Sequence, residues 1–174
     1  MAIIIHAVQK LLNTSRLKAG QYISAGDEGQ LLHSWYAKLI STGFTGKSLV
    51  MYVHEPSLLS VVCRGKTIGG TWDEFNKRLP AVLSKVGFNE DLIQFEVSHA
   101  INYIVAKTSS RSMISYMNQM TLVLEWHDYP SFEAISLDEM EDQLIDYLYS
   151  TKNKKDGYTK PGEYWREFFD GRQG

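Results

Sequence analysis

The feature that most constrains the fold of this chain is the order of its segments, because β-prone segments come first and helical segments follow. Short runs rich in β-branched and aromatic residues, separated by turns with glycine or proline, fill much of the first 64 residues. Beyond residue 70 the apolar side chains mostly recur at helical spacing. This order differs from the regular strand–helix alternation of doubly wound proteins. The predicted strands are residues 2–7, 31–41, 47–54, 58–64 and 102–107.

Capping residues support the helical segments. Thr71 with Glu74, and Ser136 with Glu139, have the spacing of the reciprocal capping box that begins helices. Pro80 lies inside the first of these helices, and because proline lacks an amide donor and clashes with the preceding turn, we expect a kink or break there. The predicted helices are residues 9–17, 71–86, 89–101, 111–126, 136–150 and a short aromatic helix near Pro161. Together the segments predict an α+β fold, with a small, mainly antiparallel sheet and helices packed on one face.

The composition fits one folded domain, since 174 residues with 44% hydrophobic and 22% charged residues are ordinary for a globular protein. We expect a single domain over residues 1–151, and a basic and aromatic C-terminal segment, 152–174, that docks on the domain or on a partner. The only cysteine, Cys63, cannot form an internal disulfide. No apolar run approaches the length of a signal peptide or of a membrane span. We therefore expect a cytoplasmic protein with no membrane partner.

Motifs for nucleotide, metal or nucleophilic chemistry fail on inspection. Two Gly-Lys-Ser/Thr sequences approach the phosphate-binding loop, but Ser41 and Ser60 stand where its first glycine is required, and neither sequence leads into a predicted helix. The five histidines have no metal-ligand spacing, so we predict no metal and no cofactor. Cys63 lies in a predicted strand, which favours an inert core thiol over a nucleophile.

The best candidate for a ligand site is the segment 108–112, Thr-Ser-Ser-Arg-Ser, between a predicted strand and a predicted helix. Amides at a helix start, the hydroxyls of Ser109, Ser110 and Ser112, and the Arg111 guanidinium can hold a phosphate or a carboxylate. The alternative, which is the more common arrangement, is a hydroxyl N-cap beside an arginine that bonds a carbonyl or a surface acid.

Basic and aromatic residues alternate in the C-terminal segment, which allows three interpretations. The aromatic side chains can dock on the core, form an interface with a protein partner or a second copy, or stack on single-stranded nucleic acid. The net charge of −2 makes nucleic acid the least favoured partner. The residues are Lys152, Lys154, Lys155, Lys160, Arg166 and Arg172, with Tyr158, Tyr164, Trp165, Phe168 and Phe169.

Several short sequence pieces, in a fixed order, carry a family resemblance. They are Gln9-Lys10-Leu11-Leu12 after the first strand, Ser34-Trp35-Tyr36-Ala37 on the next, a Gly-Lys turn before 49–55, and Lys107-Thr108-x-x-Arg111-Ser112 followed by Met117-Asn118. With them the chain resembles an uncharacterised bacterial domain family of unknown function, over about residues 3–125. That family tends to carry asparagine where this chain has Lys38 and His54.

The resemblance implies a compact bacterial domain and no particular activity. It also implies that five polar or aromatic positions gather at one site, namely Gln9, Lys10, Trp35, Arg111 and Asn118. If Lys10 and Arg111 each follow a strand, both can lie at the same end of the sheet.

The leading hypothesis is a non-enzymatic binding or regulatory module for a protein partner, a second copy of the chain, or a small anionic ligand near Lys10 and Arg111. The second is a small enzyme acting on a phosphorylated or nucleic-acid substrate. The third is single-stranded nucleic-acid binding through residues 152–174.

Overall fold

The computed structural model describes residues 2–20, 29–125, 128–150, 155 and 157–173. Its strands are β1 (Ala2–Ala7), β2 (Ser34–Ser41), β3 (Ser48–His54), β4 (Ser60–Arg64), β5 (Asn102–Lys107), β6 (Tyr149–Ser150) and β7 (Tyr158–Thr159). Its helices are α1 (Gln9–Ser15), α2 (Ile68–Lys85), α3 (Glu90–His99), α4 (Arg111–Glu125), α5 (Leu137–Asp146) and α6 (Pro161–Asp170). Among the described residues, no helix combines the length and the apolar character needed to cross a membrane.

The main sheet is mixed, so the prediction of a mainly antiparallel sheet is wrong. Its strand order is β4-β3-β2-β1-β5. The β2–β3 and β3–β4 pairs are antiparallel, whereas β1 is parallel to both β2 and β5. Parallel neighbours require long crossover connections, and here α1 with the segment after it, and then α2 with α3, return the chain to the same end of the sheet.

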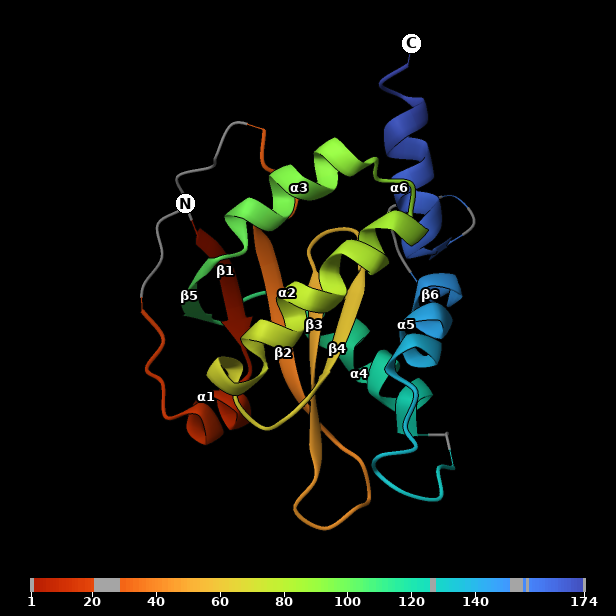
Figure 1. Ribbon diagram of the computed structural model, residues 1–174. Coiled ribbons are helices and arrows are strands. Elements are labelled where there is room, and N and C mark those ends of the chain that lie inside the picture. Colours follow the sequence, from red (N-terminus) through yellow and green to blue (C-terminus); the bar gives the residue numbers. More distant parts are fainter. Residues whose placement is uncertain (1, 21–28, 126–127, 151–154, 156, 174) are drawn as a thin grey trace.

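Helices cover both faces of the sheet, so the prediction of helices on one face is also wrong. Side chains of α1, α2, α3 and α6 pack on what we call the first face, and those of α4 and most of α5 pack on the second face. In β3, Val50 and Tyr52 contribute to the first core cluster, while Met51 and Val53 contribute to the second. Figure 1 shows α2 and α3 in front of the sheet and α4 behind it. The prediction of an α+β fold is confirmed.

Helix α2 begins one turn earlier than its predicted capping box. Thr67 is the N-cap, and its hydroxyl accepts from the Gly70 amide at 2.9 Å. Thr71 lies inside the helix, buried, with its hydroxyl 2.7 Å from the Tyr52 hydroxyl. The Glu74 carboxylate accepts from the Arg64 amide of β4 instead of capping the helix. The Thr71–Glu74 cap prediction is therefore wrong, because both side chains serve contacts with the sheet.

Pro80 does not break α2, which continues to Lys85. Leu79 and Val82, on either side of the proline, are buried in the first core cluster. Burial of this apolar face stabilises the helix by more than one missing hydrogen bond costs. Of the predicted kink or break at Pro80, the break is therefore wrong.

Other helix ends agree with the sequence. The side chains of Asn89 and Ser136 accept from the Leu92 and Glu139 amides, at 2.9 and 3.2 Å, and so cap α3 and α5. Pro161 stands in the first turn of α6. Helix α5 ends at Asp146, earlier than predicted, because the chain leaves it to form β6.

Candidate functional site

A groove of about 940 Å³ lies between α4, the turn that joins β3 to β4, and the C-terminal elements. Its apolar lining residues are the exposed Pro56 and the buried Leu58 and Met113, and the remaining side chains are polar. The polar lining residues are Glu55, Ser110, Arg111, Ser112, Ser115, Tyr116, Gln119, Ser150, Thr159, Tyr164 and Glu167.

The first wall of the groove is the N-terminal half of α4. The hydroxyl of Tyr36 accepts from the Ser110 amide at 3.2 Å and lies 3.5 Å from the Ser109 hydroxyl. The Ser110 hydroxyl accepts from the Met113 amide at 3.2 Å, which is the N-cap contact considered above. Arg111 follows this cap and is exposed, with no hydrogen bond or ion pair to any described residue. The cap thus fixes the backbone and leaves the guanidinium uncommitted.

The second wall is the β3–β4 turn, which presents Glu55. The Glu55 amide donates to Ser34 O at 3.0 Å, and the Leu58 amide donates to His54 O at 2.8 Å. Leu58 has a φ of 64°, a left-handed conformation that costs an L-residue roughly 1–2 kcal/mol. The turn therefore has a defined backbone, and the Glu55 carboxylate has no partner among the residues that the structure describes.

The third wall comes from β6, β7 and α6, through Ser150, Thr159, Tyr164 and Glu167. Burial raises the pKa of the Tyr164 hydroxyl, so this side chain stays neutral and can both donate and accept hydrogen bonds. Hydroxyls thus come from both sides of the groove, and its charges are carried by Glu55, Arg111 and Glu167.

The structure brings together only part of the predicted site. Ser110, Arg111 and Ser112 line the groove, and Ser109 lies beside it. Asn118, further along α4, accepts from the Lys38 ammonium at 3.0 Å.

The remaining predicted residues lie on the other side of the sheet. Trp35 is fully buried among first-face side chains, where its indole donates to Leu32 O at 2.8 Å. Gln9 and Lys10 are exposed at the start of α1, whose apolar side chains also pack on the first face. The strands before Lys10 and Arg111 do end side by side, since Ala7 pairs with Lys107, but the two helices that follow diverge to opposite faces.

Sequence reasoning missed Glu55 and, in the third wall, Ser150, Thr159 and Glu167, whereas Tyr164 was named among the aromatic residues of the C-terminal segment. Their positions are distant from residue 111 along the chain, and none belongs to a recognisable motif. The only local signal for Glu55 was the proline that follows it, which marked a turn.

The two positions that differ from the resembled family have structural partners. Lys38 donates to Asn118 and Thr121, and burial lowers its pKa, although Glu125 acts in the opposite direction. His54 is fully buried, with Nδ1 2.7 Å from the Ser57 hydroxyl and Nε2 3.0 Å from Leu31 O. Burial lowers the pKa of His54 to about 3, so the imidazole is neutral.

The buried acids bond the backbone. Glu141 accepts from the Val62 amide at 3.0 Å and forms an ion pair with Arg78, and Glu96 accepts from the Leu31 and Leu32 amides at 2.7 and 3.2 Å. Burial raises the pKa of both carboxyl groups. With Glu74, Glu141 occupies outward amides of the edge strand β4, which protects that edge from pairing with another chain.

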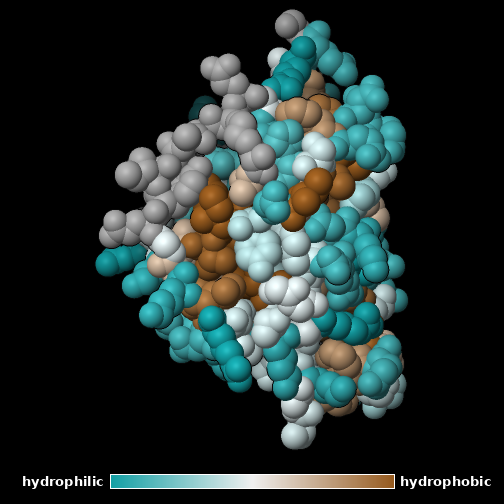
Figure 2. Space-filling model, turned by 60° about the vertical axis from the view of Figure 1, so that its left-hand side comes forward, coloured by the Kyte–Doolittle hydropathy of each residue, from teal (hydrophilic) through white to brown (hydrophobic). Residues whose placement is uncertain are grey.

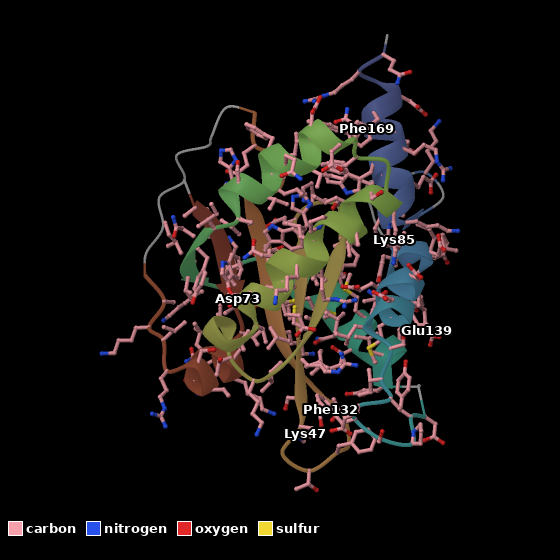
Figure 3. The ribbon with its side chains drawn as sticks, in the orientation of Figure 1. Lys47, Asp73, Lys85, Phe132, Glu139 and Phe169 are labelled. Carbon is pink, nitrogen blue, oxygen red and sulfur yellow. The ribbon has the colours of Figure 1, made fainter. Side chains whose placement is uncertain are left out.

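Further surface features lie outside the groove. A pocket of about 280 Å³ between the β2–β3 hairpin and the end of α4 is lined by both buried apolar side chains and polar residues. Nearby, Phe132 lies under the cationic groups of Lys47 and Arg64, 5.6 and 5.9 Å from its ring centre (Figure 3).

Apolar surface is also visible on the side of β1 and β5 (Figure 2), where Ile101 is 70% exposed. Among the described residues, no histidine, cysteine and acid cluster could hold a metal.

The fold and the groove define the chain as a mixed-sheet α+β protein with a polar groove beside its second-face helices. It belongs to the family described as Domain of unknown function (DUF6933), whose profile matches residues 4–164. The predicted membership of an uncharacterised domain family is confirmed, and the match extends well beyond residue 125. No curated protein matches the chain.

Proposed function

We propose that this protein is a non-enzymatic binding module whose groove holds a ligand with an anionic group against Arg111. The observation that carries the proposal is the state of Arg111. Its backbone is fixed by the Ser110 cap, its side chain lines the groove, and it has no partner among the described residues. A guanidinium presented in this way can form a bidentate, charge-assisted contact with a carboxylate or a phosphate.

The remaining lining suits recognition better than chemistry. Serine, threonine, tyrosine and glutamine side chains supply many hydrogen-bonding groups around Arg111, and within the described part of the chain no histidine or cysteine lines the groove. Cys63 is buried in the core, and burial raises the pKa of its thiol, which argues against a nucleophilic role. The carboxylates with raised pKa, Glu96 and Glu141, bond backbone amides outside the groove.

Nucleic acid is a weaker candidate for this ligand. Trp165 of the C-terminal segment is 2% exposed and packs against Phe88, so its ring is not available for stacking on bases. Lys152 and Lys154 of the predicted basic segment lie outside the described residues. In the groove, the Glu55 carboxylate repels a chain of phosphates.

The test is binding of defined anions to wild-type protein and to two variants. Inorganic phosphate, an acidic peptide and a single-stranded oligonucleotide are titrated against wild type, Arg111→Gln and Lys10→Gln, with melting temperature and calorimetry as readouts. Lys10→Gln is the matched control, because it removes an exposed cation on the other side of the sheet. We expect Arg111→Gln to weaken the binding of one anion by about 10–100-fold, and Lys10→Gln to leave it unchanged. Equal binding by wild type and Arg111→Gln would contradict the proposal.

A further inference from the structure

We infer that the groove binds a segment of a protein chain that carries both an acidic and a basic side chain. The inference rests on the proposed function and specifies its ligand. Two side chains of opposite charge line the groove and form no ion pair with each other. Arg111 on α4 and Glu55 on the β3–β4 turn both line it, and no ion pair joins them.

Both charges are held on ordered backbone. Arg111 follows the Ser110 cap in the first turn of a helix, and Glu55 follows β3 in a turn whose amides bond Ser34 O and His54 O. Neither side chain pairs with the other or with another described residue, so both charges remain available to a ligand. A ligand with complementary charges can pair with both, which supplies orientation as well as affinity.

The charge balance of the groove disfavours a ligand that is only anionic. Among the lining residues that the structure describes, Arg111 is the one cation, and Glu55 is a carboxylate with no partner in the described part of the chain. A phosphate or a polyphosphate that pairs with Arg111 is repelled by the Glu55 carboxylate. A ligand with one acidic and one basic group relieves that repulsion.

The rest of the lining fits a polypeptide. Pro56 is exposed and offers apolar surface to an aliphatic or aromatic side chain, and the side chains of Ser115, Gln119 and Thr159 offer hydrogen bonds to peptide groups. A polypeptide segment supplies acidic, basic, apolar and amide groups in one chain. The groove is also large enough for an extended ligand, since it is near the upper end of small-molecule sites.

The experiment is selection from a random peptide library displayed on phage, with the full chain as bait. Wild type, Arg111→Gln, Glu55→Gln and the control Asp73→Asn are used in parallel, and phosphate binding is measured for each. Asp73 is an exposed acid on α2, at the front of the molecule in Figure 3, on the opposite side of the sheet from α4. Selected peptides are then synthesised, and their affinities for each variant are measured.

We expect wild type and Asp73→Asn to select peptides with an acidic and a basic residue at a preferred spacing. Arg111→Gln should lose the preference for the acidic residue, and Glu55→Gln should lose the preference for the basic residue. Each variant should bind a peptide selected by wild type about tenfold or more weakly. If peptides or phosphate bind through Arg111 and Glu55→Gln binds them as wild type does, the inference is wrong and the proposed function stands. If Arg111→Gln binds every tested peptide and phosphate as wild type does, both the inference and the proposed function are wrong.

Discussion

The His54 imidazole links the groove turn to the core. His54 is the last residue of β3. Its imidazole forms hydrogen bonds with the Ser57 side chain within the β3–β4 turn and with Leu31 O outside it. The ring lies between Trp35 and Trp165, whose ring centres are 5.4 and 5.7 Å away. Because burial lowers its pKa to about 3, the folded protein keeps this side chain neutral over the range in which an unfolded histidine gains a proton.

This difference predicts a loss of stability in mild acid. As pH falls below about 6.5, the unfolded chain binds a proton at His54 that the folded chain does not bind until about pH 3, so the free energy of unfolding falls by up to about 1.4 kcal/mol per pH unit. The unfolded His54→Asn chain cannot bind a proton at position 54. We therefore expect this variant to be less stable than wild type at pH 7.5, but to lose less of its free energy of unfolding on acidification. Urea unfolding between pH 7.5 and 5.5 measures both slopes. His99→Asn, a partly exposed position, is the control, and parallel wild-type and His54→Asn curves would show that His54 does not cause the loss.

At the scale of the element, α2 shows packing overriding a local rule. Its sequence contains a proline at position 80 and glycines at 69 and 70, yet it forms a continuous helix from Ile68 to Lys85. Trp72, Phe75, Leu79 and Leu83 are buried on one side of it, against the first face of the sheet. The helix is therefore held chiefly by tertiary burial, as most helices in proteins are.

The proline should still reduce the stability of α2. In Pro80→Ala the new amide can donate within the helix, and we expect the free energy of unfolding to rise by about 1–2 kcal/mol, the gain being reduced by the greater freedom of the unfolded chain. Ser84→Ala, at an exposed position of the same helix, is the control. It changes helix propensity alone, and we expect it to raise the free energy of unfolding by about 0.5 kcal/mol. Chemical denaturation measures both. A Pro80→Ala protein no more stable than wild type would mean that the packing of α2 is adapted to the proline.

At the scale of the whole molecule, α6 closes the first core. Trp165 packs against Phe88 at 4.8 Å between ring centres, and Phe169 packs against Phe88 at 5.2 Å. Figure 1 places α6 beside the ends of α2 and α3, far in sequence from the first strands, and Figure 3 labels Phe169 next to these helices. The last helix therefore contributes to the same core cluster as β1, although the two are at opposite ends of the chain.

This arrangement predicts that the C-terminal helix unfolds with the rest of the protein. Trp165→Ala should lower the free energy of unfolding by about 3–5 kcal/mol in one cooperative transition. Tyr158→Ala, at a position 52% exposed, should have a much smaller effect. Circular dichroism and tryptophan fluorescence recorded along the same denaturation curve test this. Two separate transitions, with α6 lost first, would show instead that residues 152–174 behave as an appended segment.

The candidate site was predictable only where its residues are contiguous. Ser110, Arg111 and Ser112 follow one another at the junction of a strand and a helix, so local chemistry identified them. Trp35 was placed at the site because of its sequence context, but the pleat directs it into the first-face core. Glu55 comes from another segment, and nothing local relates residue 55 to residue 111.

The sequence by itself determined the α+β class, most strand positions, the Asn89 and Ser136 caps and the membership of an uncharacterised family, because these depend on propensity, periodicity and motif order within short windows. Only the tertiary structure decided the parallel pairing of β1, the helices on both faces, the unbroken α2 and the groove. Each of these depends on which distant segments meet, and the free energy that selects the pairing comes from burial shared across the whole chain.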